Sequence, residues 1–261
     1  MENRIPVLMY HRVGEANSSW ERKYCVHPSQ FLSHMLMLKK AGWHAIELDD
    51  FFAWLKGLLV LESRSFLLTF DDGYSGVHQY AAPILSELGW PATVFLVSKL
   101  IGQRDNWCHG ENPSGNTYPL MDWNSIRDLK KKGFTFQSHT RTHPDLSTLS
   151  DGELEAELSG ARVDLSNSLD SEVEYLAYPY GRYDERVLKA TVSAGYKAAF
   201  SVQPGFNRQF TDLFRIRRLD VFGTDSATSL KIKMALGTND GSFGKLLRYG
   251  LDRILDRVRN P

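Results

Sequence analysis

The sequence has few cysteines and no excess of charge of either sign. Cys25 and Cys108 are the only cysteines in 261 residues, and they lack the short spacing of a thiolate zinc site, which argues against a disulfide framework or a cysteine-based metal centre. Lysine plus arginine total 31, as do aspartate plus glutamate, so the net charge gives no indication of a nucleic-acid partner. We therefore expect no nucleic acid among the partners.

Long apolar runs and targeting signals are also absent. The longest run, residues 51–61, contains Lys56 and is about half the ~20 residues that a transmembrane helix needs. No basic segment followed by an apolar segment and a small-residue cleavage site opens the chain. As given, the chain is expected to be cytoplasmic, although a chain whose signal peptide had been removed would look the same.

Short apolar runs alternate with helical patterns along the whole chain. Strands are predicted over residues 6–10, 44–46, 65–70, 92–97, 134–138, 173–178, 198–202 and 215–221. Helices are predicted over residues 28–41, 49–56, 76–88, 123–132, 151–169, 184–194 and 226–236. This alternation is typical of βα units around a parallel sheet, so we expect an α/β barrel or a doubly wound sheet. The length fits one barrel, and we predict a single domain over residues 1–261.

Polar residues follow the carboxyl ends of several predicted strands, where barrel enzymes place their active sites. These positions hold His11-Arg12, Asp71-Asp72-Gly73, residues 139–143, Pro179-Tyr180-Gly181, and Asp220 with Arg217 and Arg218. Side chains that can bind a metal or move protons are therefore predicted on one rim.

Two of these segments favour a metal site. Asp71 and Asp72 end an apolar strand, and because neighbouring side chains of an extended chain point apart, we expect each carboxylate to have its own task; capping of the next helix is the alternative. His139 and His143 lie on a turn, since Pro144 follows them. Two imidazoles and one carboxylate are how zinc and iron-type ions are held for catalysis, and the carboxylate would be one of the two aspartates.

Residues 101–122 form the one long connection without periodicity. Such a segment is a lid, a substrate-contacting loop or disordered. Trp107, His109 and Tyr118 favour a loop that contacts substrate.

Three motifs together resemble the polysaccharide deacetylases, carbohydrate esterase family 4. They are Thr69-Phe70-Asp71-Asp72-Gly73, residues 138–146 (SHTRTHPDL) and Tyr178-Pro179-Tyr180-Gly181, and the resemblance extends from residue 6 to residue 221. It implies a distorted (β/α) barrel of about seven parallel strands with helices outside. The implied reaction is removal of N-acetyl groups from amino sugars with one divalent ion, usually Zn²⁺, with Co²⁺ and Ni²⁺ as alternatives.

The resemblance also implies residue roles. Asp72, His139 and His143 match the family's metal ligands, Asp71 matches its general base, and the backbone N–H of Tyr180 matches its oxyanion contact. The neighbouring residues of the third motif, together with the loop tryptophan, are expected to contact the sugar: Tyr178, Pro179 and Trp107.

The chain departs from the family pattern at two places. Ala177 stands where the family commonly has an arginine that orients the base, and Arg218 is expected to take over; a surface arginine is the alternative. No histidine follows His143, although most members carry a general-acid histidine near the C-terminus. In a subset that includes poly-β-1,6-N-acetylglucosamine deacetylases, that strand lies at the N-terminus instead, and Leu8-Met9-Tyr10-His11 resembles it. His11 is thus expected to be the general acid, rather than a polar strand end.

The predicted function is a metal-dependent hydrolase acting on an N-acetylated polysaccharide or lipid-linked oligosaccharide. A deformylase or O-acetyl esterase, and a non-catalytic carbohydrate-binding domain, are the alternatives. The tail, residues 242–259, has one apolar stripe with basic residues elsewhere. It is expected to close the barrel as an amphipathic helix, with peripheral contact to the inner membrane face as the alternative.

Overall fold

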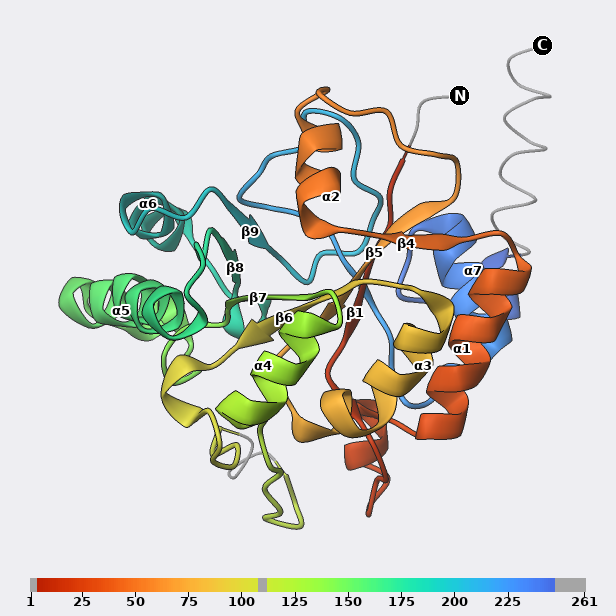
Figure 1. Cartoon of the computed structure of the whole chain (residues 1–261), viewed down its shortest axis with the longest axis horizontal. Helices are drawn as coiled ribbons and strands as arrows, with labels where there is room; N and C mark the ends of the chain where they lie inside the picture. The colour runs from red at the N-terminus through yellow and green to blue at the C-terminus, as the bar shows by residue number, and fades with distance from the viewer. Residues whose placement is uncertain (1–3, 108–111, 247–261) are drawn as a thin grey trace.

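A curled parallel sheet surrounded by helices forms the body of the protein (Figure 1). The structure, a computed structural model, describes residues 4–107 and 112–246. Seven strands follow one another in the order β10-β1-β5-β6-β7-β8-β9, and β4 pairs with β5 beside this path. Their bounds are β1 Val7–Tyr10, β4 His44–Ile46, β5 Ser65–Phe70, β6 Ala92–Leu96, β7 Phe134–Ser138, β8 Tyr175–Ala177, β9 Ala198–Phe200 and β10 Leu219–Asp220. The prediction of a distorted (β/α) barrel is confirmed.

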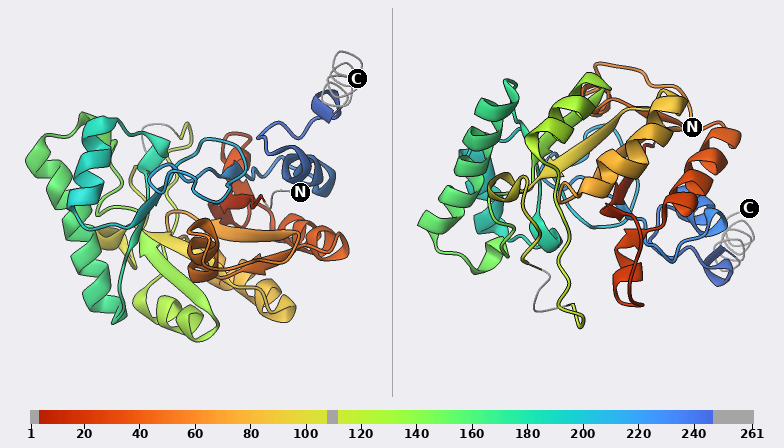
Figure 2. Two further views of the ribbon diagram at one scale, coloured as in Figure 1. Left: turned by 90° about the horizontal axis from the view of Figure 1, so that it is seen from above. Right: turned by 60° about the horizontal axis from the view of Figure 1, so that its bottom comes forward.

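Helices lie around this sheet in all three views (Figures 1 and 2). Most begin and end within one residue of their predicted bounds, and they are α1 Pro28–Lys40, α2 Leu48–Leu55, α3 Ala82–Leu88, α4 Trp123–Lys131, α5 Asp151–Leu169, α6 Glu185–Ser193 and α7 Ala227–Leu236. The exception is the predicted helix over residues 76–88. A π-helical turn, Val77–Ala81, precedes α3 there, because Pro83 has no N–H to donate in a regular ladder.

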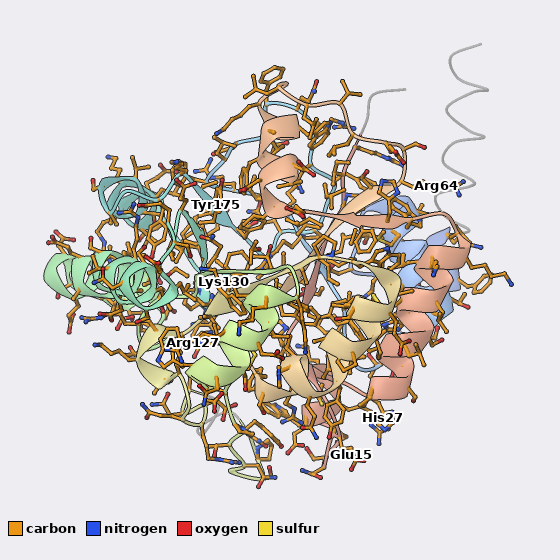
Figure 3. All side chains as sticks on the ribbon, viewed as in Figure 1. Glu15, His27, Arg64, Arg127, Lys130 and Tyr175 are labelled. Carbon is orange, nitrogen blue, oxygen red and sulfur yellow. The ribbon has the colours of Figure 1, made fainter. Side chains whose placement is uncertain are left out.

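Alternate residues of the strands face two apolar clusters. Val7 belongs to the cluster inside the barrel and Leu8 to the cluster between sheet and helices. Helix α2 contributes Phe51, Phe52 and Trp54 to the interior cluster. The ring of Phe52 stacks on Tyr175 of β8 with centroids 4.1 Å apart (Tyr175 is labelled in Figure 3). The amino-terminal end of the barrel is therefore filled with aromatic side chains, which leaves the carboxyl end for the site.

The last predicted strand, residues 215–221, is divided between the two edges of the sheet. Ile216 hydrogen-bonds to Ala199 of β9 and to Ser201 just after it, whereas Leu219–Asp220 pairs with β1. Of the predicted strand, only Leu219–Asp220 (β10) is a regular strand, because the chain has to cross from the edge at β9 to the edge at β1. This crossing places residues 217–220 at the closure of the barrel.

A small second sheet was not predicted. Arg12–Val13 (β2) pairs in parallel with Cys25–Val26 (β3), with a 3₁₀ turn, Glu21–Lys23, between them. Two-residue strands give no detectable alternation. The described part of the chain holds no helix with the length and apolar character to cross a membrane. Most of the predicted tail helix, residues 247–259 of 242–259, and Cys108 and His109 lie outside the described residues.

Candidate active site

Strand register brings three titratable side chains to adjacent strand ends. Tyr10 of β1 pairs with Phe70 of β5, so His11 and Asp71 are the next residues on neighbouring strands. Met9 pairs with Asp220 of β10 on the other side of β1. His11, Asp71 and Asp220 all line one pocket of about 370 Å³. Arg12, which also lines this pocket, donates to the carbonyl of Glu15, a residue labelled at the lower side of Figure 3.

Asp71 is held by a buried arginine. The Arg218 guanidinium donates from Nη1 and Nη2 to the two carboxylate oxygens at 2.7 and 2.8 Å, and from Nε to the Ser201 carbonyl at 2.9 Å. Arg218 is 0% exposed. Burial alone would raise the pKa of Asp71, but the positive Arg218, together with the His139 and His11 imidazoles, holds this pKa below its ordinary value. Asp71 therefore stays ionised at neutral pH.

Asp72 lies with both histidines of the second motif. Its Oδ1 is 3.4 Å from Nε2 of His139 and 3.4 Å from Nε2 of His143, and all three residues are buried. Burial would raise the pKa of Asp72, but the two imidazoles lower it to about 2, while burial lowers the pKa of His143 to about 3. His139 donates from Nδ1 to the Ala177 carbonyl at 2.8 Å, which leaves its Nε2 as the acceptor nitrogen.

These three residues fit a divalent cation. One ligand atom from each lies within 4.8 Å of the others, and Asp72 Oδ1 has no hydrogen-bond partner among the described residues despite its burial. Ligand atoms about 2.1 Å from a tetrahedral zinc ion lie about 3.4 Å apart, which matches the distance from Asp72 Oδ1 to each imidazole nitrogen. An unpaired buried carboxylate oxygen is costly, so a cation explains why it is there.

Strained backbone sets the direction of the site residues. Asp72, Thr140, His143 and Tyr180 all have positive φ, from 57° to 71°, which is unusual for residues with a Cβ. The prediction that Asp71 and Asp72 point to different partners agrees with the structure, but the reason given for it was wrong. Asp72 is in the left-handed region rather than extended, and neither carboxylate caps the next helical turn, whose N-cap is Gly76.

Helix α5 holds the turn that carries the two histidines. Glu157 accepts hydrogen bonds from the backbone N–H groups of Arg141 and Thr142 at 2.8 and 3.0 Å, and from the Thr142 hydroxyl at 2.6 Å. The Arg141 side chain lies on α5 and pairs with Asp164 at 2.9 Å. A Cβ on Gly160 would come within 2.7 Å of that side chain, so glycine leaves room for it.

The residues expected to contact substrate are not all at the pocket. Trp107 stacks on His143 with ring centroids 4.4 Å apart, and Tyr180 contacts the same imidazole edge-on at 4.6 Å. Tyr178 lines the pocket, but its side chain is buried and its hydroxyl donates to the Phe214 carbonyl. Pro179 is buried and is not among the pocket-lining residues.

Described parts of the predicted loop, residues 101–107 and 112–122, are tied to the barrel by two buried carboxylates that sequence reasoning missed. Asp105 accepts from the Tyr74 hydroxyl at 2.8 Å and from the Tyr118 N–H at 2.6 Å. Glu21 accepts from Asn116 at 3.2 Å and from Arg12 at 3.4 Å. No spacing rule links these positions, because their partners are 9 to 95 residues away.

Comparison with known proteins places the chain among relatives of similar architecture. A family model described as polysaccharide deacetylase matches residues 60–199, more than half of the chain. The Bacillus subtilis protein YxkH is 26% identical over 218 residues, 84% of this chain and 71% of that protein. A poly-beta-1,6-N-acetyl-D-glucosamine N-deacetylase of Staphylococcus aureus is 28% identical over 225 residues, 77% of this chain and 73% of that protein.

Among solved structures, the Streptococcus pyogenes deacetylase PplD in complex with acetate superposes with a TM-score of 0.76. The superposition covers 90% of this chain and 99% of PplD at 22% identity, so it supports the fold. The region matched by the family model contains Asp71, Asp72, both histidines and Tyr180, whereas His11 and Arg218 lie outside it.

Proposed function

Because the chain belongs to the polysaccharide deacetylase family, we propose that it is a metal-dependent hydrolase that removes N-acetyl groups from an amino-sugar glycan. The observation that carries the proposal is the meeting of Asp72, His139 and His143 beside the Asp71–Arg218 pair in one pocket that also contains His11. The Staphylococcus aureus relative, an N-deacetylase of a poly-N-acetylglucosamine, supports an N-acetylated hexose polymer as the substrate class.

Asp72, His139 and His143 would hold the divalent cation. When bound, a cation such as Zn²⁺ would polarise the acetyl carbonyl and make water a stronger acid; Co²⁺ and Ni²⁺ remain alternatives to Zn²⁺. The buried Asp72 carboxylate supplies negative charge, and the lowered pKa of His143 keeps that imidazole neutral and able to act as a ligand.

The other residues would move protons and stabilise charge. Asp71, ionised beside Arg218, accepts the proton of the attacking water. The backbone N–H of Tyr180 donates to the oxygen on which negative charge develops. As the amide C–N bond breaks, His11 donates a proton to the sugar nitrogen, so the products are acetate and a free amine. Arg218 positions Asp71 and does not itself contact the reacting atoms.

Turnover of defined glycans would test this proposal. Purified protein is incubated with N-acetylglucosamine oligomers and each cation in turn, and lost acetyl groups are counted by mass spectrometry. N-formylated and O-acetylated sugars are run in parallel. We expect N-deacetylation that requires the cation. Preferential turnover of the formyl or O-acetyl substrate would support those alternatives, and glycan binding without turnover would support a carbohydrate-binding domain.

Location is a separate proposal. We infer a cytoplasmic enzyme that reaches its glycan from the inside of the cell. Fractionation of cells expressing the full chain tests it: recovery in the cytosol supports the proposal, and recovery outside the cell contradicts it.

A further inference from the structure

Two groups of aromatic side chains line the pocket, each beside a different imidazole. Trp107 and Tyr180 contact His143. The second group, which we call the outer aromatic wall, consists of Trp20, Tyr24 and Phe222. Tyr24 contacts His11 edge-on with ring centroids 5.8 Å apart, and its ring is 5.9 Å from Trp20 and 6.5 Å from Phe222. None of these three residues has a role in the reaction proposed above.

The wall is built from segments far apart in the sequence. Trp20 and Tyr24 flank the 3₁₀ turn after β2, whereas Phe222 follows β10; Figure 2 shows the two segments close together at the lower rim of the right-hand view. Their backbones are in direct contact, since the Gly223 N–H donates to the Lys23 carbonyl at 3.2 Å. A Cβ on Gly223 would lie only 2.0 Å from the Cys25 carbonyl oxygen, so only glycine permits this approach.

Contacts with Asp225 and Lys233 also hold Phe222 in place. Its backbone N–H donates to Asp225, which pairs with Lys233, a lysine only 1% exposed. The Lys233 ammonium lies 4.7 Å from the Phe222 ring centroid. A buried ion pair of this kind stabilises little by itself, but it specifies where the loop that carries Phe222 lies.

The open side of the wall faces the pocket. Tyr24 is 39% exposed, and Trp20 and Phe222 are half-buried although they are large and partly apolar. Exposed apolar surface gathered in a pocket indicates a ligand-binding surface. The apolar C–H faces of a pyranose ring match aromatic rings, and the Lys23 ammonium, 4.9 Å from the Tyr24 centroid, can donate to sugar oxygens.

The direction of the reaction decides which part of the glycan meets the wall. The acetyl carbonyl has to lie near Asp72, and the sugar nitrogen has to lie near His11, which contacts Tyr24. The rest of the chain then continues past His11. We propose that Trp20, Tyr24 and Phe222 form a subsite for a second N-acetylated hexose unit, next to the unit that is deacetylated. This inference rests on the proposed function and deepens it.

The test compares substrate lengths in variants of the wall. In Phe222→Ala and in Trp20→Ala, the ratio of kcat/KM for an N-acetylglucosamine tetramer to kcat/KM for the monosaccharide should fall by roughly threefold to tenfold, the loss expected for one aromatic contact. Phe210→Ala, which removes an 82% exposed ring outside the pocket, is the control and should leave the ratio unchanged. A ratio that is unchanged in both wall variants overturns the subsite.

Binding without turnover separates this inference from the proposed function. Titration calorimetry of the tetramer in chelator, where the proposed function predicts no turnover, should show threefold to tenfold weaker binding by Phe222→Ala than by the parent protein. If the parent binds the tetramer through Phe222 but never deacetylates it, the proposed function fails and the subsite stands. If the parent deacetylates the tetramer while Phe222→Ala binds it equally well, the subsite fails and the function stands.

Lys23 gives the subsite a preference that can be measured. An ammonium group on an already deacetylated neighbouring sugar would be repelled there, so the parent protein should favour fully acetylated tetramers over tetramers with one glucosamine. Lys23→Gln should reduce this preference by roughly twofold to fivefold, the range of an exposed charge pair. If the parent protein and Lys23→Gln show the same preference for fully acetylated tetramers, Lys23 does not belong to the subsite.

Discussion

The carboxyl group of Asp71 shows two opposing effects at a single residue. Burial favours the protonated acid, whereas the paired Arg218, which donates to both oxygens at 2.7 and 2.8 Å, favours the carboxylate; together with His139 and His11 it lowers the pKa of Asp71 despite the burial. A buried ion pair is weak evidence for stability. Its effect here is on the protonation of Asp71, which can accept a proton only when it is ionised.

Replacing Arg218 should move the acid limb of the pH–activity profile. A general base is active above its pKa, so any change that raises the pKa of Asp71 makes activity disappear at a higher pH as the solution is acidified. Arg218→Lys keeps the charge but loses one of the two hydrogen bonds. We expect kcat to fall by about 10- to 100-fold and the acid limb of kcat/KM to move upward. Arg217→Lys, an exposed neighbour, is the control; an acid limb that stays in place in Arg218→Lys would contradict the role.

His11 allows a direct test of the general acid. His11→Ala should lower kcat by roughly 10²- to 10⁴-fold, because the amine then leaves without a proton donor, while metal content stays at the parent level. Metal analysis, circular dichroism and deacetylation assays of one preparation check this. His78→Ala, which removes a histidine outside the pocket, is the matched control. Parent-like turnover by His11→Ala would show that another group protonates the nitrogen.

At the scale of elements, helix α5 acts on the metal site without contributing a ligand. Glu157 satisfies two backbone N–H groups within the turn from His139 to His143, and this turn also contains two residues with positive φ. Without that carboxylate the strained turn would relax. The site thus depends on a helix whose own sequence shows only ordinary amphipathic features.

Glu157→Ala should weaken metal binding more than it weakens folding. Supporting residues of metal ligands typically contribute 10- to 100-fold in metal affinity, so we expect a loss in that range, with activity recovering at saturating metal. Competition with a chelator of known affinity measures the change. Glu155→Ala, an exposed residue of the same helix, should behave like the parent protein. Equal metal affinity in both variants would mean that the turn from His139 to His143 keeps its conformation without Glu157.

Elements with strong periodic signals could be predicted from the sequence, whereas those created by tertiary contact could not. Strands β4, β5 and β7 have the predicted bounds because apolar runs between glycine-ended helices leave little choice. The two-residue strands β2 and β3 carry no periodicity, and the divided closure of the barrel depends on where both sheet edges lie. Likewise, the three motifs indicated the metal site, but the partner of Asp71 is 147 residues away and could only be inferred from family resemblance.

At the scale of the whole molecule, stability and function are separated between the two ends of the barrel. The amino-terminal end is filled by the aromatic residues of α2, whereas the carboxyl end contains left-handed residues and an unpaired buried carboxylate oxygen. Such features lower the stability of the metal-free protein. The barrel can hold them because the rest of its core is closely packed, so a bound cation should stabilise the whole fold.

Thermal unfolding with and without metal tests this coupling. For the parent protein, a cation at 100 to 1,000 times its dissociation constant should add about 3 to 4 kcal/mol and raise Tm by roughly 5 to 15 °C. Asp72→Asn should lose this metal-dependent rise. In chelator it should melt at or somewhat below the parent Tm, because the neighbouring imidazoles hold the pKa of Asp72 at about 2 in the folded state, which favours the ionised carboxylate that the amide replaces. If Asp72→Asn keeps the metal-dependent rise in Tm, the Asp72 carboxylate is not a ligand of the cation; if it melts well above the parent protein in chelator, the ionised carboxylate destabilises the metal-free fold.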